Sequence, residues 1–152
     1  PIVKMLNKGV TVALGTDGAS SNNNLDMLEE MRSAALLHKA AGDPTTICSY
    51  QALEMATKNG AKALGLGDKI GVLKPGMVAD LILIDFDKPH LYPRHDILAH
   101  LVYAAQSSDI DTVIIDGKIV VQSGKPLTID VQETCEEIQK VADRIVGSSG
   151  SR

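Results

Sequence analysis

Residues 10–24 read Val-Thr-Val-Ala-Leu-Gly-Thr-Asp-Gly-Ala-Ser-Ser-Asn-Asn-Asn, an apolar run followed by a polar turn. The β-branched and apolar residues 10–14 are typical of a buried strand, and the glycines after them indicate a turn. Asp17 is then at the carboxyl end of that strand, where α/β barrels place their chemistry. Turn aspartates also commonly bond their own loop. The residues alone therefore leave a catalytic and a structural role open for Asp17.

Helical patterns flank this stretch on both sides. Residues 1–8 predict the end of a helix, and residues 25–41 predict a longer helix with apolar positions at helical spacing. A third helix is predicted over 49–58, with Ser49 as its N-cap.

The pattern changes near Gly67 from helices to strands. Residues 69–73 and 79–86 are predicted as strands, joined by a turn at Lys74-Pro75-Gly76. Residues 81–84 are apolar on both faces, so we expect this strand to be covered on both sides.

The rest of the chain predicts a hairpin between two helices. These elements are a helix over 94–105, two strands over 112–115 and 118–122, and a terminal helix over 131–146. Asp116-Gly117 between two apolar runs is the strongest hairpin signal in the chain. Asp130 and Glu133 form a capping box for the terminal helix, which leaves 147–152 as a polar tail.

Composition excludes several classes of protein. The 152 residues include 15 Lys and Arg against 19 Asp and Glu, so no basic excess is available to neutralise nucleic-acid phosphates. The longest apolar runs fall short of the roughly 20 residues that a membrane span needs. Two distant cysteines without a CxxC pattern favour a reducing compartment. We therefore expect a cytoplasmic protein with neither a nucleic-acid nor a membrane partner.

Local metal-ligand spacing is absent from the sequence. The four histidines (His38, His90, His95 and His100) form no HxH or HxxxH pair. A spacing of five on a helix rotates side chains by roughly 140°, so we do not expect His95 and His100 to converge there. Cys48 and Cys135 occupy apolar helix positions, where a small buried hydrophobic residue is the expected role.

The stretch over residues 12–23 resembles the last barrel strand and following loop of deaminases in the amidohydrolase superfamily. Its closest likeness is to the 5-methylthioadenosine/S-adenosylhomocysteine deaminase group, within the wider family of triazine hydrolases and guanine deaminases. The resemblance continues at Leu25-Asp26-Met27, Glu30-Met31-Arg32, Ala56-Thr57, 59–65, Ile70-Gly71, 73–76, 79–82, 101–105 and 112–118. It covers roughly residues 1–146.

The resemblance implies an α/β fold that combines a metal-bearing (β/α)₈ TIM barrel with a small β-sandwich built from both chain termini. A complete barrel takes about 250 residues. We therefore expect only the C-terminal portion here, a piece of a longer protein, as the start at Pro1 rather than Met also suggests. The expected division is the end of the barrel over 1–66, the sandwich share over 67–126, a terminal helix over 127–146 and a tail over 147–152.

The resemblance also implies a metal-dependent aminohydrolase that deaminates an adenosine derivative. Asp17 matches the strand-eight aspartate, which binds or approaches a divalent metal and takes the proton from the metal-bound water. The resulting hydroxide attacks the ring carbon bearing the amino group. Zinc is the foremost metal, with iron and manganese as alternatives. Because a catalytic zinc typically needs three protein ligands, we expect the isolated chain to lack metal and activity.

Ser21 matches a loop position that faces the substrate in the methylthioadenosine group. The residues alone are equally compatible with Ser20 and Ser21 being helix-capping loop residues. Glu29, Glu30 and Arg32 are assigned to a solvated helix face or an ion pair rather than to a site.

Two other interpretations stay open. The first is a hydrolase of another ring substrate, of the guanine, cytosine or triazine chlorohydrolase type, because specificity depends on barrel loops outside this sequence. The second is a non-catalytic fragment or assembly module that pairs with the missing N-terminal part of the barrel or forms a homo-oligomer. A small binding domain of unrelated fold would require accidental motif agreement.

Overall fold

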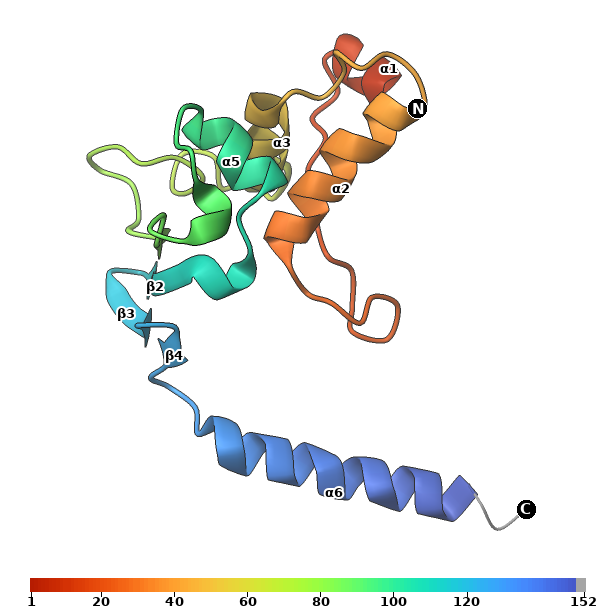
Figure 1. Cartoon of the computed structure of the whole chain (residues 1–152), viewed down its shortest axis with the longest axis vertical. Coiled ribbons are helices and arrows are strands. Elements are labelled where there is room, and N and C mark those ends of the chain that lie inside the picture. The colour runs from red at the N-terminus through yellow and green to blue at the C-terminus, as the bar shows by residue number, and fades with distance from the viewer. Residues whose placement is uncertain (150–152) are drawn as a thin grey trace.

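The computed structural model describes residues 1–149 as a cluster of short helices, a small antiparallel sheet beside it and a long C-terminal helix that extends away (Figure 1). The helices are α1 (Ile2–Asn7), α2 (Met27–Ala40), α3 (Ser49–Ala56), α4 (Lys58–Ala63), α5 (Ile97–Tyr103) and α6 (Val131–Ser149), with 3₁₀ turns η1 (Pro89–Leu91) and η2 (Ser107–Asp109). The strands are β1 (Leu81–Ile84), β2 (Ile110–Ile115), β3 (Lys118–Gln122) and β4 (Lys125–Pro126).

Helix α2 organises the core. Asp26 caps its N-terminus, because Oδ1 accepts hydrogen bonds from the backbone N–H groups of Leu28 (2.8 Å) and Glu29 (3.2 Å). The buried face of α2 packs with α3 and α5. The core consists of Leu28, Met31, Ala35, Ile47, Ala52, Met55, Leu91, Val102 and Ala105. The predicted helices over 1–8, 25–41 and 94–105 are confirmed as α1, α2 and α5, with shorter bounds.

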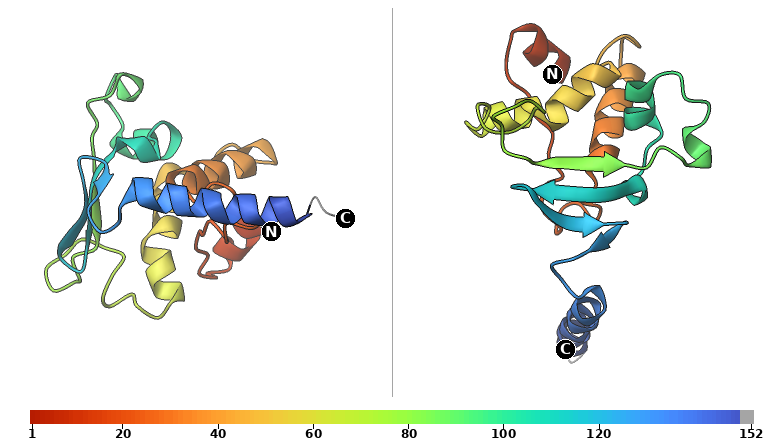
Figure 2. Two further views of the ribbon diagram at one scale, coloured as in Figure 1. Left: turned by 90° about the horizontal axis from the view of Figure 1, so that it is seen from below. Right: turned by 90° about the vertical axis from the view of Figure 1, so that its left-hand side faces the viewer.

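The sheet is a simple antiparallel meander in the order β1-β2-β3-β4, and Figure 2 shows its strands following one another toward α6. Asp116 and Gly117 join β2 to β3 with φ values of 49° and 74°. Two consecutive positive φ values give the type I′ geometry that matches the twist of a hairpin. The predicted hairpin is confirmed.

The predicted strand over 10–14 is wrong for this chain, because these residues form no strand. Three hydrogen bonds hold the segment: the Val10 N–H donates to the Met5 carbonyl (3.0 Å), the Leu14 N–H donates to the Met55 carbonyl (2.9 Å), and Asn59 Nδ2 donates to the Val12 carbonyl (3.0 Å). A barrel strand needs backbone partners along its edges. The described residues supply helices beside this segment rather than strands, so its barrel pairing does not form.

Two further predictions for the middle of the chain are wrong. Residues 69–73 form turns and bends, not a strand. Strand β1 is not covered on both sides, since Ile82 and Leu83 are 46% and 51% exposed. The reason is the same in both cases: the described chain supplies neither a further strand at this edge nor a second layer over β1.

Two local boundaries also differ. The helix predicted over 49–58 divides into α3 and α4 at Thr57, whose φ of −128° and ψ of −92° are not helical. Cys48, rather than Ser49, occupies the N-cap of α3.

Cys48 and Cys135 are both free and exposed, contrary to the expected burial.

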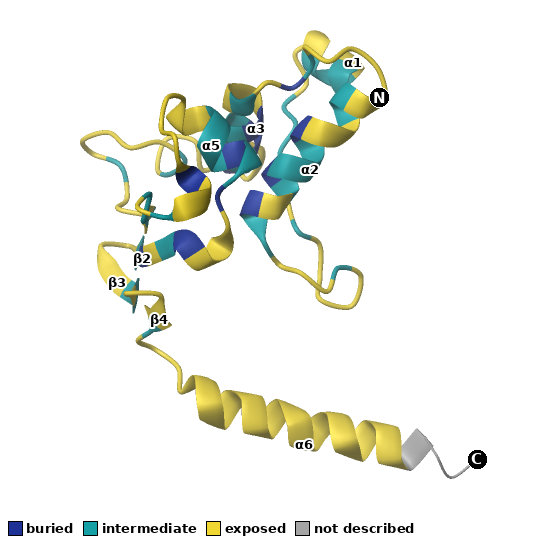
Figure 3. Cartoon of the chain, viewed as in Figure 1, coloured by how far each residue is buried: buried dark blue, intermediate teal, exposed yellow. Residues whose placement is uncertain are grey.

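Helix α6 is exposed along its whole described surface. One half of the predicted capping box is present, since the Glu133 N–H donates to Asp130 Oδ1 (3.0 Å). Every side chain over 131–147 is exposed, including an apolar stripe of Val131, Cys135, Ile138, Ala142 and Ile145 (Figure 3). Among residues 1–149, no helix is both long and apolar enough to cross a membrane.

Candidate functional site

Asp17 lies in an exposed loop over residues 15–26, which connects the 10–14 segment to α2 and is called the Asp17 loop below. Its φ of 60° is in the left-handed region, which aspartate tolerates better than most residues. Its Oδ1 accepts the Gly18 N–H at 2.7 Å, and the Thr16 hydroxyl donates to its carbonyl at 3.1 Å. Asp17 therefore bonds its own loop and still presents its carboxylate to solvent.

Asn22 is the half-buried centre of this loop. Its Nδ2 donates to the Thr16 carbonyl and to Glu30 Oε1, both at 3.0 Å, and its Oδ1 accepts the Asn24 N–H at 3.1 Å. The side chain thus bridges the residue before Asp17 to the first turn of α2. The sequence did not indicate Asn22, and it assigned Glu30 to a solvated helix face or an ion pair, whereas Glu30 is half-buried.

Ser21 is exposed on the same loop. Its backbone N–H and that of Asn22 both donate to the Gly18 carbonyl at 2.9 Å. This turn leaves Ser21 exposed in the loop that also contains Asp17. The structure is compatible with a substrate-facing side chain and with a simple turn residue.

Asp26, the N-cap of α2, accepts several hydrogen bonds and lies near a positive charge. Desolvation acts to raise the pKa of Asp26, but hydrogen bonds from the Ser107 hydroxyl and from two helix N–H groups outweigh it and hold this pKa below its ordinary value. The charge of Arg32 acts in the same direction. Arg32 Nη2 also donates to the Ala105 carbonyl at 2.5 Å, so Arg32 is half-buried between α2 and the end of α5 rather than solvated.

Comparison with known proteins identifies the family. The sequence pattern of the amidohydrolase family matches residues 1–120. This chain belongs to the amidohydrolase family. The amidohydrolase assignment agrees with the likeness seen in the Asp17 loop.

Curated relatives of the chain are named as deaminases. A 5-methylthioadenosine/S-adenosylhomocysteine deaminase of Pelotomaculum thermopropionicum is 60% identical over 147 residues, which are 96% of this chain and 34% of the relative. A 5'-deoxyadenosine deaminase of Methanosarcina mazei is 52% identical over 152 residues, 99% of this chain and 35% of the relative. The chain spans about a third of the length of these curated relatives.

Solved structures of amidohydrolases share the fold of the chain. An adenosine deaminase from Xanthomonas campestris with bound zinc matches with a TM-score of 0.93 and 37% identity, over 97% of this chain and 34% of that one. An atrazine chlorohydrolase from Arthrobacter aurescens, complexed with zinc, matches with a TM-score of 0.83 and 30% identity, over 92% and 31% of the two chains.

The described residues of this amidohydrolase chain supply part of a metal site at most. The Asp17 carboxylate is a suitable zinc ligand, but a catalytic zinc takes about three protein ligands. Within 1–149, no group of three or more His, Cys, Asp or Glu side chains could hold a metal ion. Asp17 as a metal ligand therefore stays a prediction.

His95 and His100 contact each other near the start of α5. His95 and His100 do converge, with ring centroids 5.4 Å apart and an edge-to-face arrangement, because His95 precedes α5 instead of lying within it. The prediction that they would not meet assumed that both lie on one helix. Their Nδ1 atoms lie within hydrogen-bond distance of the backbone carbonyls of Pro93 (3.1 Å) and Asp96 (2.6 Å).

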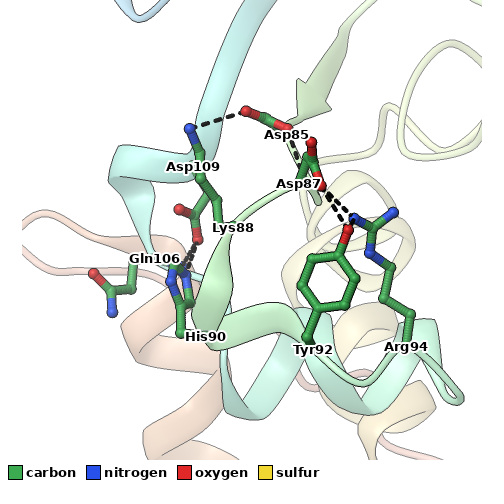
Figure 4. A network of polar contacts seen from close by, with 8 residues as sticks. All are labelled: Asp85, Asp87, Lys88, His90, Tyr92, Arg94, Gln106 and Asp109. Atoms are coloured by element: carbon green, nitrogen blue, oxygen red, sulfur yellow. Dashed lines mark hydrogen bonds and ion pairs between the residues drawn. The ribbon is translucent and has the colours of Figure 1, made fainter.

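A second polar cluster joins the end of β1 to the start of β2 (Figure 4). His90 Nε2 lies 2.8 Å from Oδ2 of the buried Asp109, which also accepts the Gln106 N–H at 2.8 Å. Asp87 Oδ1 accepts hydrogen bonds from the Tyr92 hydroxyl (2.6 Å) and from Arg94 (2.8 Å). The charged and polar groups of this cluster bond to one another. We therefore interpret the cluster as a structural connection between the helical and sheet parts.

An apolar groove of about 750 Å³ separates α3 and α4 from β1 and β2. Its lining includes Leu53, Leu64, Ile82 and Ile114, with Asp80 as its one carboxylate among the described residues. Neither Asp17 nor Ser21 lines this groove, so it is separate from the Asp17 loop.

Proposed function

We propose that this chain is the C-terminal third of a metal-dependent aminohydrolase that deaminates an adenosine derivative of the methylthioadenosine or S-adenosylhomocysteine type. The observation that carries the proposal is the 60% identity to a deaminase of that name over 96% of the chain. The zinc-containing structural relatives support a divalent metal, with zinc as the proposed ion.

Asp17 is the proposed proton carrier. In the reaction, water adds to the ring carbon that bears the amino group, the C–N bond breaks, and ammonia leaves. An exposed carboxylate at this position can accept the proton of the attacking water and return it to the departing nitrogen. A bound divalent metal would supply Lewis acidity, which lowers the pKa of water toward neutrality.

Ser21 is proposed to contact the nucleoside substrate, since it lies in the same exposed loop as Asp17. The remaining ligands would come from the N-terminal part of the barrel. The division of the chain at residues 66 and 126, a cytoplasmic location and a homo-oligomer stay predictions.

The test is hydrolysis of methylthioadenosine, S-adenosylhomocysteine and 5'-deoxyadenosine by the full-length, fully metallated protein. We expect ammonia release and conversion of the adenine ring to hypoxanthine. Asp17→Asn should lower kcat by about 10²- to 10⁴-fold, the usual contribution of general acid–base catalysis. Asp68→Asn, an exposed aspartate in a turn outside the loop, is the matched control and should leave kcat unchanged.

An enzyme that binds its metal and leaves all three nucleosides intact would contradict the proposal. Guanine, cytosine and triazine substrates would then be tested, as the structural likeness to a chlorohydrolase suggests.

For the 152-residue chain by itself, we propose a non-catalytic fragment that associates with the rest of the barrel. Asp17 is the one metal ligand proposed within this chain, and the exposed apolar side chains of β1 and α6 favour this state. Activity of the isolated chain in the same assay would refute it.

A further inference from the structure

Asn22 connects two parts of the Asp17 loop with helix α2 through one side chain. The amide group uses both functional ends: Nδ2 donates to the Thr16 carbonyl and to Glu30 Oε1, and Oδ1 accepts the Asn24 N–H. An amide side chain offers two N–H donors and one carbonyl acceptor. The loop therefore engages every kind of hydrogen-bonding group that Asn22 has.

The bond to Thr16 acts directly on the backbone of Asp17. The Thr16 carbonyl belongs to the same rigid peptide plane as the Asp17 nitrogen. Fixing that carbonyl at 3.0 Å from Asn22 Nδ2 therefore restrains the plane from which the Asp17 side chain departs. The restraint is relevant because Asp17 has a φ of 60°, a conformation that persists only where neighbouring structure supports it.

The hydrogen bond from Asn22 to Glu30 connects the Asp17 loop to helix α2. Glu30 is half-buried in the first turns of α2, next to Met31, which is 3% exposed and part of the core. A mobile loop gains a defined position only when it is tied to a rigid element. Through Asn22, the peptide plane before Asp17 is tied to the helix that organises the core.

We infer that Asn22 and Glu30 are positioning residues, which hold the Asp17 carboxylate in its working orientation through the Thr16–Asp17 peptide. The inference rests on the proposed function of Asp17. It assigns to Asn22 and Glu30 no contact with substrate or metal.

Kinetics of the full-length enzyme are the first test. A misplacement of about 1 Å in a reacting group can cost roughly 10²-fold in rate. We expect Asn22→Ala and Glu30→Ala to lower kcat by about 10- to 100-fold, with KM essentially unchanged. Glu30→Gln keeps a carbonyl acceptor for Asn22 and should restore most of the rate. Asn23→Ala changes the exposed neighbour of Asn22 and is the matched control, expected to be neutral.

Loop order in the 152-residue chain is the second test, and it does not depend on activity. The Gly18 N–H, which donates to Asp17 Oδ1, reports on the orientation of that carboxylate. In ¹⁵N relaxation measurements, Asn22→Ala should reduce the Gly18 order parameter from a value typical of rigid backbone, about 0.85, to below about 0.6. Asn23→Ala should not change it.

The two tests separate failure of this inference from failure of the proposed function. If the unsubstituted enzyme deaminates its substrate but Asn22→Ala alters neither kcat nor Gly18, the positioning role is overturned. A loss of thermal stability without a change in kcat, or a rise in KM alone, overturns it as well. If the unsubstituted enzyme is inactive, the proposed function fails. In that case an unchanged Gly18 order parameter in Asn22→Ala would also show that Asn22 does not restrain the Asp17 loop.

Discussion

His90 Nε2 and Asp109 Oδ2 lie 2.8 Å apart, and the Asp109 side chain is only 3% exposed. The pair connects η1 to η2, directly before β2. Desolvation acts to raise the pKa of Asp109. The hydrogen bonds from the Gln106 N–H and from His90, with the charges of His90 and Lys88, outweigh desolvation and hold the pKa below its ordinary value.

We predict that this pair makes the fold sensitive to acid. A carboxyl whose pKa is lowered by folding contributes stability above its unfolded pKa, and that contribution is lost as pH falls through the folded pKa. For Asp109 the loss should begin near the ordinary value of 3.8 and continue below it. Unfolding by urea at pH 7, 5, 4 and 3 measures it.

Asp109→Asn is the informative variant for this prediction. It should destabilise the chain at pH 7 by about 1–3 kcal/mol, because a buried, charge-assisted hydrogen bond is weakened. Its stability should then fall less steeply than that of the unsubstituted chain below pH 4. Parallel pH profiles for the two proteins would show that Asp109 does not carry the acid response.

Gly71 and Gly76 offer a matched pair of substitutions. Both have positive φ, 93° and 88°, but a Cβ at Gly71 would lie 2.7 Å from Ala61 Cβ and 3.1 Å from Lys58 Cα, whereas nothing lies within 4 Å of a Cβ at Gly76. Gly76→Ala should cost about 1 kcal/mol from backbone strain. Gly71→Ala should cost about 1–3 kcal/mol more, because the turn must move away from α4. Equal losses in chemical denaturation would contradict the close packing of Gly71 on α4.

Leu91 should be among the most sensitive core positions. Its side chain is 0% exposed, although it lies in a three-residue 3₁₀ turn. Leu91→Ala should destabilise the chain by about 2–5 kcal/mol, the range for leucine truncation in a packed core. Leu73→Ala, at a site 77% exposed, should change the free energy of unfolding by less than about 0.5 kcal/mol. A small loss for Leu91→Ala would place this leucine outside the cooperative core.

The exposed apolar faces should make the isolated chain self-associate. Large apolar side chains are exposed on the sheet and on α6, among them Ile82, Leu83, Ile119, Ile138 and Val146. We expect binding of a hydrophobic dye and a sedimentation mass that rises with concentration. Ile138→Lys should reduce both, whereas Gln132→Lys adds the same charge to α6 and should have little effect. A monodisperse monomer without dye binding would contradict this expectation.

The elements predicted correctly from the sequence are those specified by local signals. Asp116-Gly117 determines its hairpin within four residues, and Asp130 caps its helix within three. The strand expected over 10–14 depended on distant backbone partners instead. Because the hydrogen bonds of a strand are made between segments, an apolar run specifies the potential for a strand but not its neighbours.

In the candidate site, too, local signals could be found from the sequence and contacts between distant residues could not. Asp17 could be found from sequence because a carboxylate follows an apolar run and two glycines frame it. The contribution of Asn22 could not, since its partners Thr16 and Glu30 are brought together only by the course of the loop. Asp17 as a catalytic residue and Ser21 as a substrate contact stay predictions.

The side chains of helix α6 are exposed over residues 131–147, which include its apolar stripe. In proteins most of the stability of a helix comes from packing its apolar face against other structure, and isolated helices shorter than about 12–15 residues are marginal in water. The helical content of α6 should therefore depend on whether another surface covers its apolar stripe. Amide protons of α6 should exchange rapidly while the helix is solvated and slowly once another surface covers its apolar stripe, so their exchange rate would record assembly without any added label.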